Sequence, residues 1–158
     1  MRIAEQQIPP GSNREILVDF GCGLPPAFLE QSPFREKYGV DMRVDSTMSA
    51  GKGVHLISCN LRGPLPLNFA NAHADVVTIL ATIEHIPEEH IPWLFAEARR
   101  ILKPNGILII TTPAPWTASL LELLATLRLV STEEIADHSQ YLSKSTLVAL
   151  LKKSGFDR

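Results

Sequence analysis

The stretch ILVDFGCGLPP, from Ile16 to Pro26, decides the fold of this chain. It begins with apolar residues typical of a buried parallel strand and continues through Asp19 to two closely spaced glycines. Gly21 and Gly23 let the backbone turn tightly and let a ligand approach it without a Cβ in between. A strand that ends in such a loop indicates a nucleotide-like ligand at its carboxyl end. A proline pair stands where a dinucleotide-binding loop would have its third glycine, so the loop alone does not identify the ligand.

Composition and charge describe one ordinary globular domain. The chain has 158 residues, of which 45% are hydrophobic and 20% are charged, and its formal net charge is -2. This balance, without a basic stripe, disfavours nucleic acid as a partner. The apolar runs are too short to span a bilayer, and the N-terminal stretch MRIAEQQIPPGSNRE lacks the apolar core of a signal peptide.

The two cysteines, Cys22 and Cys59, have no metal-ligand spacing around them and no secretory context. We therefore expect a cytoplasmic protein without a metal site, which binds neither nucleic acid nor membranes. Residues 1–158 are expected to form a single domain, and residues 1–14 to be disordered or loosely attached to it.

Strand-like and helix-like segments alternate along the chain, which predicts a three-layer α/β fold with a mostly parallel sheet. The predicted strands are Ile16–Val18, Gly39–Asp41, Val54–Ser58, Ala74–Ala81 and Ile107–Pro113. The predicted helices are Ala27–Lys37, Ile91–Leu102 and Ser143–Lys153, the last one capped by Ser143 and stopped by Gly155. A turn at KPNG separates the second helix from the last strand. The leucine-rich stretch Thr117–Leu129 is most simply interpreted as part of the core or as a lid. Alternatively, it could line an apolar substrate pocket or form a dimer contact.

Five segments occur in the order of one known family. VDFGCG, YGVD, ADVVTILATIEHI, RRILKPNGILIITTP and YLSKSTLVALLKKSGF together resemble class I S-adenosylmethionine-dependent methyltransferases, and most closely the group that acts on small molecules. The resemblance covers Ile16 to Phe156. It implies a Rossmann-like three-layer sandwich that lacks the family's C-terminal antiparallel hairpin, since this sequence stops at GFDR where family members continue.

The resemblance also implies a binding site for S-adenosylmethionine, with S-adenosylhomocysteine as the product. Asp19 would help to hold the amino-acid end of this cofactor, and the loop Gly21–Gly23, with the small Cys22 inside it, would pass beneath. Asp41 would accept hydrogen bonds from both ribose hydroxyls, and it lies 22 residues beyond Asp19, close to the spacing of a strand–helix–strand unit. Both acids have a structural alternative, because Asp19 could cap the turn after its strand and Asp41 could be a loop acid.

Four more residues complete the expected site. Met42 would cover one face of the adenine, and Asn60, followed by Leu61, would accept a bond from the adenine amino group through its side-chain carbonyl. Ala81, at the end of the fourth strand, would line the sulfonium end. Asn60 also suits an ordinary loop, so its role stays open.

His85 follows the fourth strand in ATIEHIP, a position often filled by histidine in this family. It is the candidate catalytic residue, either as a base or as a contact of cofactor or substrate. A structural hydrogen bond between loop and sheet is the alternative. Methyl transfer from a sulfonium needs little acid–base help, because the protein mainly holds the nucleophile near the methyl carbon and excludes water.

The expected function is methyl transfer to an oxygen, nitrogen or carbon atom of a small-molecule, lipid or sugar-precursor acceptor. The alternative is a non-catalytic or incomplete methyltransferase-fold domain that acts as a binding or interaction module. Two features motivate it: Pro25 replaces the family's third glycine, and the sequence stops at GFDR, before the family's final hairpin. The fifth strand would then form an apolar edge, unless the sequence is a fragment, and a homodimer, another partner or the region Thr117–Leu129 could cover it. A nicotinamide-dependent dehydrogenase is disfavoured by the missing glycine.

Overall fold

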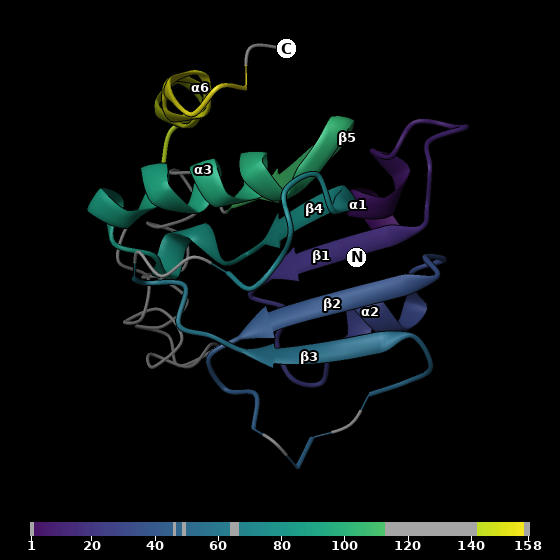
Figure 1. The fold of residues 1–158 in the computed structure, drawn as a ribbon. Helices are drawn as coiled ribbons and strands as arrows, with labels where there is room; N and C mark the ends of the chain where they lie inside the picture. Colours follow the sequence, from purple (N-terminus) through teal and green to yellow (C-terminus); the bar gives the residue numbers. More distant parts are fainter. Residues whose placement is uncertain (1, 46, 49, 64–66, 113–141, 157–158) are drawn as a thin grey trace, which may run out of the picture.

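A computed structural model describes residues 2–45, 47–48, 50–63, 67–112 and 142–156 of the chain. Its centre is a five-stranded sheet in the order β3-β2-β1-β4-β5, and every pair of neighbouring strands is parallel. The strands are β1 (Ile16–Phe20), β2 (Glu36–Asp41), β3 (Val54–Ser58), β4 (Ala74–Leu80) and β5 (Leu102–Thr111). This arrangement confirms the predicted Rossmann-like fold with a parallel sheet (Figure 1).

Helices cover both faces of the sheet (Figure 1). α1 (Arg2–Gln6) and α2 (Ala27–Gln31) lie on one face, and α3 (Ile91–Ile101) and α6 (Lys144–Lys153) lie on the other. Two short 3₁₀ turns, η1 (Ile83–His85) and η2 (Glu88–His90), join β4 to α3. In the part of the chain that the structure describes, no helix is long and apolar enough to cross a membrane.

The two faces have separate cores because the side chains of a strand alternate between them. On β1, Leu17 packs in the core with α1 and α2, whereas Val18 and Phe20 pack in the core with α3 and α6. All three side chains are fully buried. A central strand covered on both faces is apolar along nearly its whole length, which is why its one acid, Asp19, stands out.

α2 is shorter than predicted, and β2 begins earlier. The predicted helix was Ala27–Lys37, but α2 ends at Gln31 and the backbone of Ser32 is already extended, with ψ 137°. The next residue is Pro33, and proline disfavours the helical conformation in the residue before it. β2 then starts at Glu36 and pairs on both sides, with β1 and with β3. Pairing with two neighbours overrides the weak helical signal of this segment.

β5 also begins earlier than predicted. The strand was expected from Ile107, after a KPNG turn, but β5 starts at Leu102 and includes those four residues. The turn signal is present as an irregularity inside the strand: Asn105 has φ 65°, and the register with β4 shifts between Ala74 and Val76. The last predicted residue of this strand, at position 113, lies outside the described residues.

Two other strands and one helix lie close to their predicted positions. β3 has the predicted bounds, and β4 and α3 each end one residue early, at Leu80 and Ile101. At the N-terminus, residues 1–14 were expected to be disordered or loosely attached. In the structure, Ala4 of α1 and Ile8 pack into the core beside α2, where they are 3% and 4% exposed.

α6 follows the prediction for the last helix. The Ser143 hydroxyl caps it by accepting a hydrogen bond from the Thr146 amide at 3.1 Å. Gly155, which was expected to stop the helix, has φ 84° just beyond its end. The leucine-rich stretch Thr117–Leu129 lies outside the described residues.

Candidate functional site

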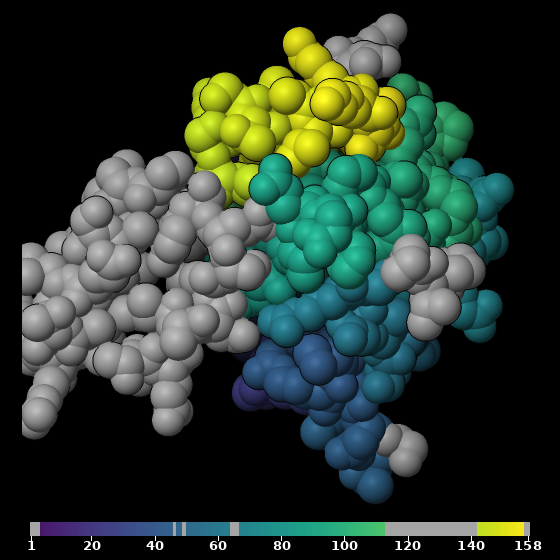
Figure 2. All heavy atoms as spheres, turned by 90° about the vertical axis from the view of Figure 1, so that its left-hand side faces the viewer, coloured from purple at the N-terminus to yellow at the C-terminus, as the bar shows by residue number. Residues whose placement is uncertain are grey.

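The carboxyl ends of the strands meet at one edge of the sheet, which faces the viewer in Figure 2. The chain proceeds from β1 outward to β2 and β3, and then crosses to β4 and β5 on the other side of β1. In parallel sheets of this kind, ligands bind where the strand order reverses, outside the carboxyl ends. The loop after β1, the end of β2 and the end of β4, which together hold most of the predicted site residues, all lie at this edge.

The loop after β1 is anchored to β2. The Gly21 and Cys22 amides both donate to the Val40 carbonyl, at 2.7 and 3.3 Å. The Gly23 amide donates to Oδ2 of Asp41 at 3.1 Å. Gly21 and Gly23 have φ values of 77° and 68°, a conformation that favours glycine. Three successive amides of the loop are thus committed to the protein itself.

The two glycines of the loop face different surroundings. A Cβ on Gly21 would overlap with the side chain of Thr82, which lies just after β4. The Thr82 hydroxyl is 3.3 Å from the Gly21 carbonyl and 3.0 Å from the Leu80 carbonyl, so it holds the two loops together. Within the described part of the chain, a Cβ on Gly23 would meet only the guanidinium of Arg43, 3.9 Å away. The Gly23 backbone is therefore less crowded than that of Gly21, and its neighbour on this side is the Arg43 guanidinium.

Cys22 is a packing residue of this loop. Its side chain is buried against Gly39 of β2, where a Cβ would come within 2.7 Å of the sulfur. Burial, together with the negative charges of Asp19 and Asp41, raises the pKa of the Cys22 thiol to about 12. The thiol therefore stays protonated and unreactive at neutral pH. Among the described residues, no group of three or more His, Cys, Asp or Glu side chains could hold a metal ion.

Asp41, the last residue of β2, collects four hydrogen bonds on its two oxygens. The Gly23 amide donates to Oδ2 at 3.1 Å, and the Arg43 amide donates to Oδ1 at 2.9 Å. The Arg43 guanidinium adds Nε to Oδ1 at 3.1 Å and Nη2 to Oδ2 at 3.2 Å. Burial acts to raise the pKa of Asp41, but the hydrogen bonds and charge of Arg43 outweigh it and hold this pKa below its ordinary value. Asp41 is therefore ionised at neutral pH.

Asp19 lies beneath the loop. It is 2% exposed, and it is aligned with Thr78 of β4, whose hydroxyl donates to Oδ1 of Asp19 at 2.6 Å. Burial raises the pKa of Asp19 to about 7, although the Thr78 hydrogen bond opposes the shift. Near neutral pH both the neutral and the charged form of this carboxyl are populated. A positive charge placed beside it would favour the carboxylate.

The other predicted binding residues differ in what they can offer a ligand. Met42 follows β2 and is 58% exposed, so it presents apolar surface at this edge. Asn60 is exposed, and its side-chain oxygen accepts a hydrogen bond from the Arg62 amide at 2.9 Å. Leu61 is buried in the core, which leaves its side chain little surface for a ligand. Ala81 is exposed and has φ 49°, at the turn where the chain leaves β4.

His85, the candidate base, lies in η1 on the loop that follows β4. It is half-buried, and its backbone amide donates to the Thr82 carbonyl at 3.0 Å. Since Thr82 also contacts Gly21, His85 belongs to the same edge of the sheet as the glycine loop. The neighbouring Glu84 is buried, at 2% exposed.

Sequence reasoning missed three residues at this edge. Arg43, Thr78 and Thr82 each bind one of the predicted site residues. Thr78 carried a signal, because it is a polar residue inside the apolar strand ADVVTIL. Arg43 and Thr82 carried none, since their partners depend on how separate loops meet after folding.

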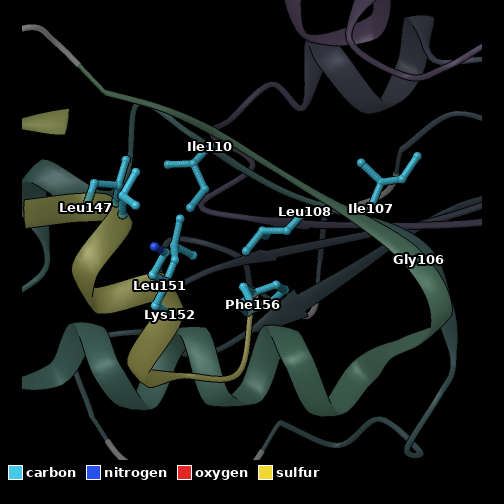
Figure 3. Close-up of a pocket in the computed structure, with 9 residues that line it drawn as sticks. Gly106, Ile107, Leu108, Ile110, Leu147, Leu151, Lys152 and Phe156 are labelled. Carbon is cyan, nitrogen blue, oxygen red and sulfur yellow. The ribbon is translucent and has the colours of Figure 1, made fainter. Parts of the chain in front are cut away.

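A groove of about 570 Å³ lies between β5 and α6 and contains none of the predicted site residues (Figure 3). Leu108 and Ile110 of β5 form one wall, and Leu147 and Leu151 of α6 form the other, with Phe156 beyond the helix. β5 is an edge strand of the described sheet. The groove thus adds apolar surface beside a strand that pairs on one side only among the described residues.

Comparisons with known proteins give the family and the fold of the chain. A family profile described as "Methyltransferase domain" matches residues 2–157. Among solved structures, the chain is similar to a SAM-dependent methyltransferase from Archaeoglobus fulgidus, with 18% identity and a TM-score of 0.71 over 98% of this chain and 66% of that one. It is also similar to a SAM-dependent methyltransferase from Mesorhizobium loti, with 15% identity and a TM-score of 0.68 over 97% of this chain and 79% of that one.

A further similar structure is a chain from the complex between the Haloferax volcanii Trm112 methyltransferase activator and its partner. The identity is 15% and the TM-score 0.70, over 98% of this chain and 66% of that one. At such identities the likeness shows the fold. The chain spans 66% of the length of the Archaeoglobus and Haloferax structures. Among curated proteins, none matches the sequence.

Proposed function

The chain belongs to the methyltransferase domain family, and we propose that it transfers a methyl group from S-adenosylmethionine to an acceptor. The proposed acceptor is an oxygen, nitrogen or carbon atom of a small molecule, lipid or sugar precursor, and S-adenosylhomocysteine is the product. The observation that carries this proposal is the Asp41 carboxylate, which is ionised, lies at the carboxyl end of β2 and is hydrogen-bonded to the Gly23 amide. Such a carboxylate can accept hydrogen bonds from two adjacent ribose hydroxyls.

Other described residues fit the remaining parts of the cofactor. Met42, exposed beside Asp41, offers apolar surface for the adenine. Asn60 would accept from the adenine amino group through a second lone pair of its side-chain oxygen. Ala81 would line the sulfonium end. Asp19, with its pKa near 7, would become charged when the positive end of the cofactor lies close to it.

The hydrogen bonds of the glycine loop support a cofactor without phosphate. A dinucleotide-binding loop presents free amides to a pyrophosphate. Here the amides of Gly21, Cys22 and Gly23 are bonded to β2 instead. A sulfonium cofactor carries no phosphate and does not need those amides, so the same loop suits it better than a nicotinamide dinucleotide.

The protein's part in the reaction is mainly to hold the two reactants. The cofactor supplies an electrophilic methyl carbon bonded to a positively charged sulfur. Asp41 and Gly23 would hold its ribose end, and the turn after β4 would place its methyl end near the acceptor. His85 would accept a proton at an imidazole nitrogen when the acceptor is a neutral hydroxyl or a carbon acid, and would only contact an acceptor that is already a free amine.

Calorimetric titration with S-adenosylmethionine and S-adenosylhomocysteine tests the proposal directly. We expect both ligands to bind the wild-type chain. In Asp41→Asn the affinity should fall about 10- to 100-fold, because the amide lacks the charge and one of the acceptor oxygens. Absence of binding at millimolar ligand would overturn the proposal.

Asp45→Asn is the matched control for Asp41→Asn. Asp45 is an exposed acid on the same connection between β2 and β3, bonded locally to Thr47. The Asp45→Asn substitution changes the net charge by the same amount as Asp41→Asn. The affinity of this variant for S-adenosylhomocysteine should equal that of the wild type. Equal losses in both variants would mean that general charge, and not the ribose contact, governs binding.

A second candidate function is a non-catalytic interaction module, and the groove beside the β5 edge favours it. In this proposal a second copy of the chain covers the groove and the edge, because an exposed apolar strand edge is a site of association. Light scattering after size-exclusion chromatography tests it. A dimer that Val148→Glu, in the exposed wall of the groove, converts to a monomer would support the proposal, and a wild-type monomer at all accessible concentrations would contradict it.

A further inference from the structure

The guanidinium of Arg43 is hydrogen-bonded to Asp41, the carboxylate that is proposed to hold the ribose. Arg43 gives Asp41 three of its four hydrogen bonds, from its amide, Nε and Nη2. The fourth comes from the Gly23 amide. A carboxylate has about four lone-pair sites. The acceptor capacity of Asp41 is therefore filled, and two ribose hydroxyls can be received only if some of these donors leave.

The Arg43 side chain is the donor that can leave at least cost. Its side chain is 63% exposed, whereas that of Asp41 is 8% exposed. Among the described residues, Asp41 is the one ion-pair and hydrogen-bond partner of the guanidinium. Both the Gly23 amide and the Arg43 amide are part of the backbone that shapes the site. Rotation of one exposed side chain into solvent, by contrast, frees both carboxylate oxygens and leaves the backbone unchanged.

A second observation places Arg43 over the open part of the glycine loop. Apart from the two chain neighbours of Gly23, Nη2 of Arg43 is the single heavy atom of the described residues within 4 Å of a Cβ built on Gly23. The guanidinium therefore stands in the space through which a ligand would approach Gly23. It blocks the acid and the loop at the same time.

We infer that Arg43 is a displaceable latch on the ribose site: its guanidinium binds Asp41 in the free chain and must release it before the ribose can bind. This inference rests on the proposed function, in which Asp41 holds the ribose. Arg43 then lowers the affinity for the cofactor. The loss of binding free energy equals the free energy of the ion pair that must break. For a pair with one exposed partner the expected effect is about two- to fivefold.

The latch predicts an unusual response to salt. Salt screens exposed charge pairs, so it weakens the contact between Arg43 and Asp41 more than it weakens hydrogen bonds from uncharged ribose hydroxyls. Adenosine carries no charge, and its own long-range attraction to the protein therefore does not depend on salt. Its affinity for the wild-type chain should rise with salt.

The test compares the wild-type chain with Arg43→Gln, Arg43→Lys and Arg35→Gln, using S-adenosylhomocysteine and adenosine in calorimetry. Arg35→Gln is the matched control, because Arg35 is 68% exposed and forms an ion pair at 2.7 Å with Glu15 at the other end of β2. We expect Arg43→Gln to bind about two- to fivefold more tightly than the wild type and to lose the salt response. Arg43→Lys should lie between them because an ammonium lacks the two-pronged geometry, and Arg35→Gln should match the wild type.

A ligand-free readout shows whether the latch itself exists. Without the guanidinium, the pKa of Asp41 should rise in Arg43→Gln, as measured by carboxyl NMR titration, and it should not change in Arg35→Gln. An unchanged Asp41 pKa would overturn the inference whatever the binding data are.

The outcomes separate this inference from the proposed function. If the wild type and Arg43→Gln bind equally while Asp41→Asn loses binding, the proposed function stands and the latch is wrong. Weaker binding in Arg43→Gln would also overturn the latch, because Arg43 would then be a ligand contact. If no variant binds S-adenosylhomocysteine, the proposed function fails, and the latch fails with it.

Discussion

Two aspartates at opposite ends of the sheet have equal burial and different partners. Asp41 ends β2 and Asp75 lies near the start of β4, and each is 7% exposed. For each of them burial acts to raise the pKa, but hydrogen bonds and a nearby cation hold the pKa below its ordinary value. Both are therefore ionised at neutral pH, one at the proposed binding edge and the other at the opposite edge.

The partners differ in how far along the chain they lie. Asp75 accepts hydrogen bonds from Nδ2 of Asn13 at 2.9 Å, from the first amide of β1 at 2.8 Å and from Nζ of Lys103 at 2.8 Å. These donors are 62, 59 and 28 positions away. Asp41 receives most of its hydrogen bonds from Arg43, two positions away. The two equally buried aspartates thus have different roles. Asp75 ties distant segments into the fold, whereas the charge of Asp41 is neutralised by a neighbour on an exposed loop.

The largest expected effect is on stability, in Asp75→Ala. The change leaves the Lys103 ammonium and two other donors without their acceptor, and we expect the free energy of unfolding to fall by about 3 kcal/mol. Urea denaturation with an unchanged m-value is the measurement. Asp45→Ala, at an exposed position, should match the wild type within the error of the measurement. A loss below about 1 kcal/mol in Asp75→Ala would mean that the distant partners do not tie the fold together.

Asp41→Asn should separate binding from stability. The affinity for S-adenosylhomocysteine is expected to fall, as described above, while the free energy of unfolding changes by less than about 1 kcal/mol, because the lost ion pair has an exposed partner. The same urea series measures the second quantity. A stability loss as large as that of Asp75→Ala would erase the difference between the two aspartates.

We expect Asp19 to give the free energy of unfolding a pH dependence opposite in sign to the one that Asp41 and Asp75 give it. Its raised pKa of about 7 means that the folded chain keeps this proton while the unfolded chain loses it above pH 4. Between about pH 4 and 7 the unfolding free energy should therefore fall as pH rises, by about 1 kcal/mol per pH unit in the middle of that range. Thermal melts of the wild type and Asp19→Asn at pH 5, 6 and 7 test this. The melting temperature of the variant should rise relative to that of the wild type as pH rises.

Below pH 4 the other two aspartates should dominate. Their pKa values are lowered in the folded chain, so their contribution to stability is fully present above the ordinary value and is lost as pH falls through the folded-state value. Melts of Asp75→Ala and Asp41→Asn at low pH should approach that of the wild type. A constant difference across pH would contradict these directions.

The smallest expected effect distinguishes the two cations. Lys103→Gln should lower the free energy of unfolding by about 1 kcal/mol, because Lys103 is one-third exposed and holds a buried acid that two other donors cannot neutralise. Arg43→Gln should change it by less than about 0.5 kcal/mol. Equal values for the two variants in the same denaturation series would show that Arg43 has a structural role like that of Lys103.

Much of the sheet was predictable because its signals are local. β3 is a strand of alternating residues and β4 is a nearly continuous apolar run, and both were predicted to within one residue. The starts of β2 and β5 were not, since the residues just before Gly39 carry a weak helical signal and the KPNG segment carries a turn signal, and pairing with neighbouring strands overrides both. The acids of the candidate site were predictable as types and positions, but the partners that separate their pKa values, Thr78 for Asp19 and Arg43 for Asp41, were not.

The amino-acid sequence carried the family resemblance in its ordered motifs, and it also carried the succession of strands along the chain and the place of the glycine loop, because apolar periodicity and glycine spacing are properties of neighbouring residues. The contacts between side chains from different segments came from the folded structure. It set Thr82 against Gly21, Thr78 against Asp19 and Arg43 over Asp41. The physical reason is that a carboxylate binds whichever donors the fold brings within about 3 Å, and that choice is made by packing and loop geometry after the elements have formed.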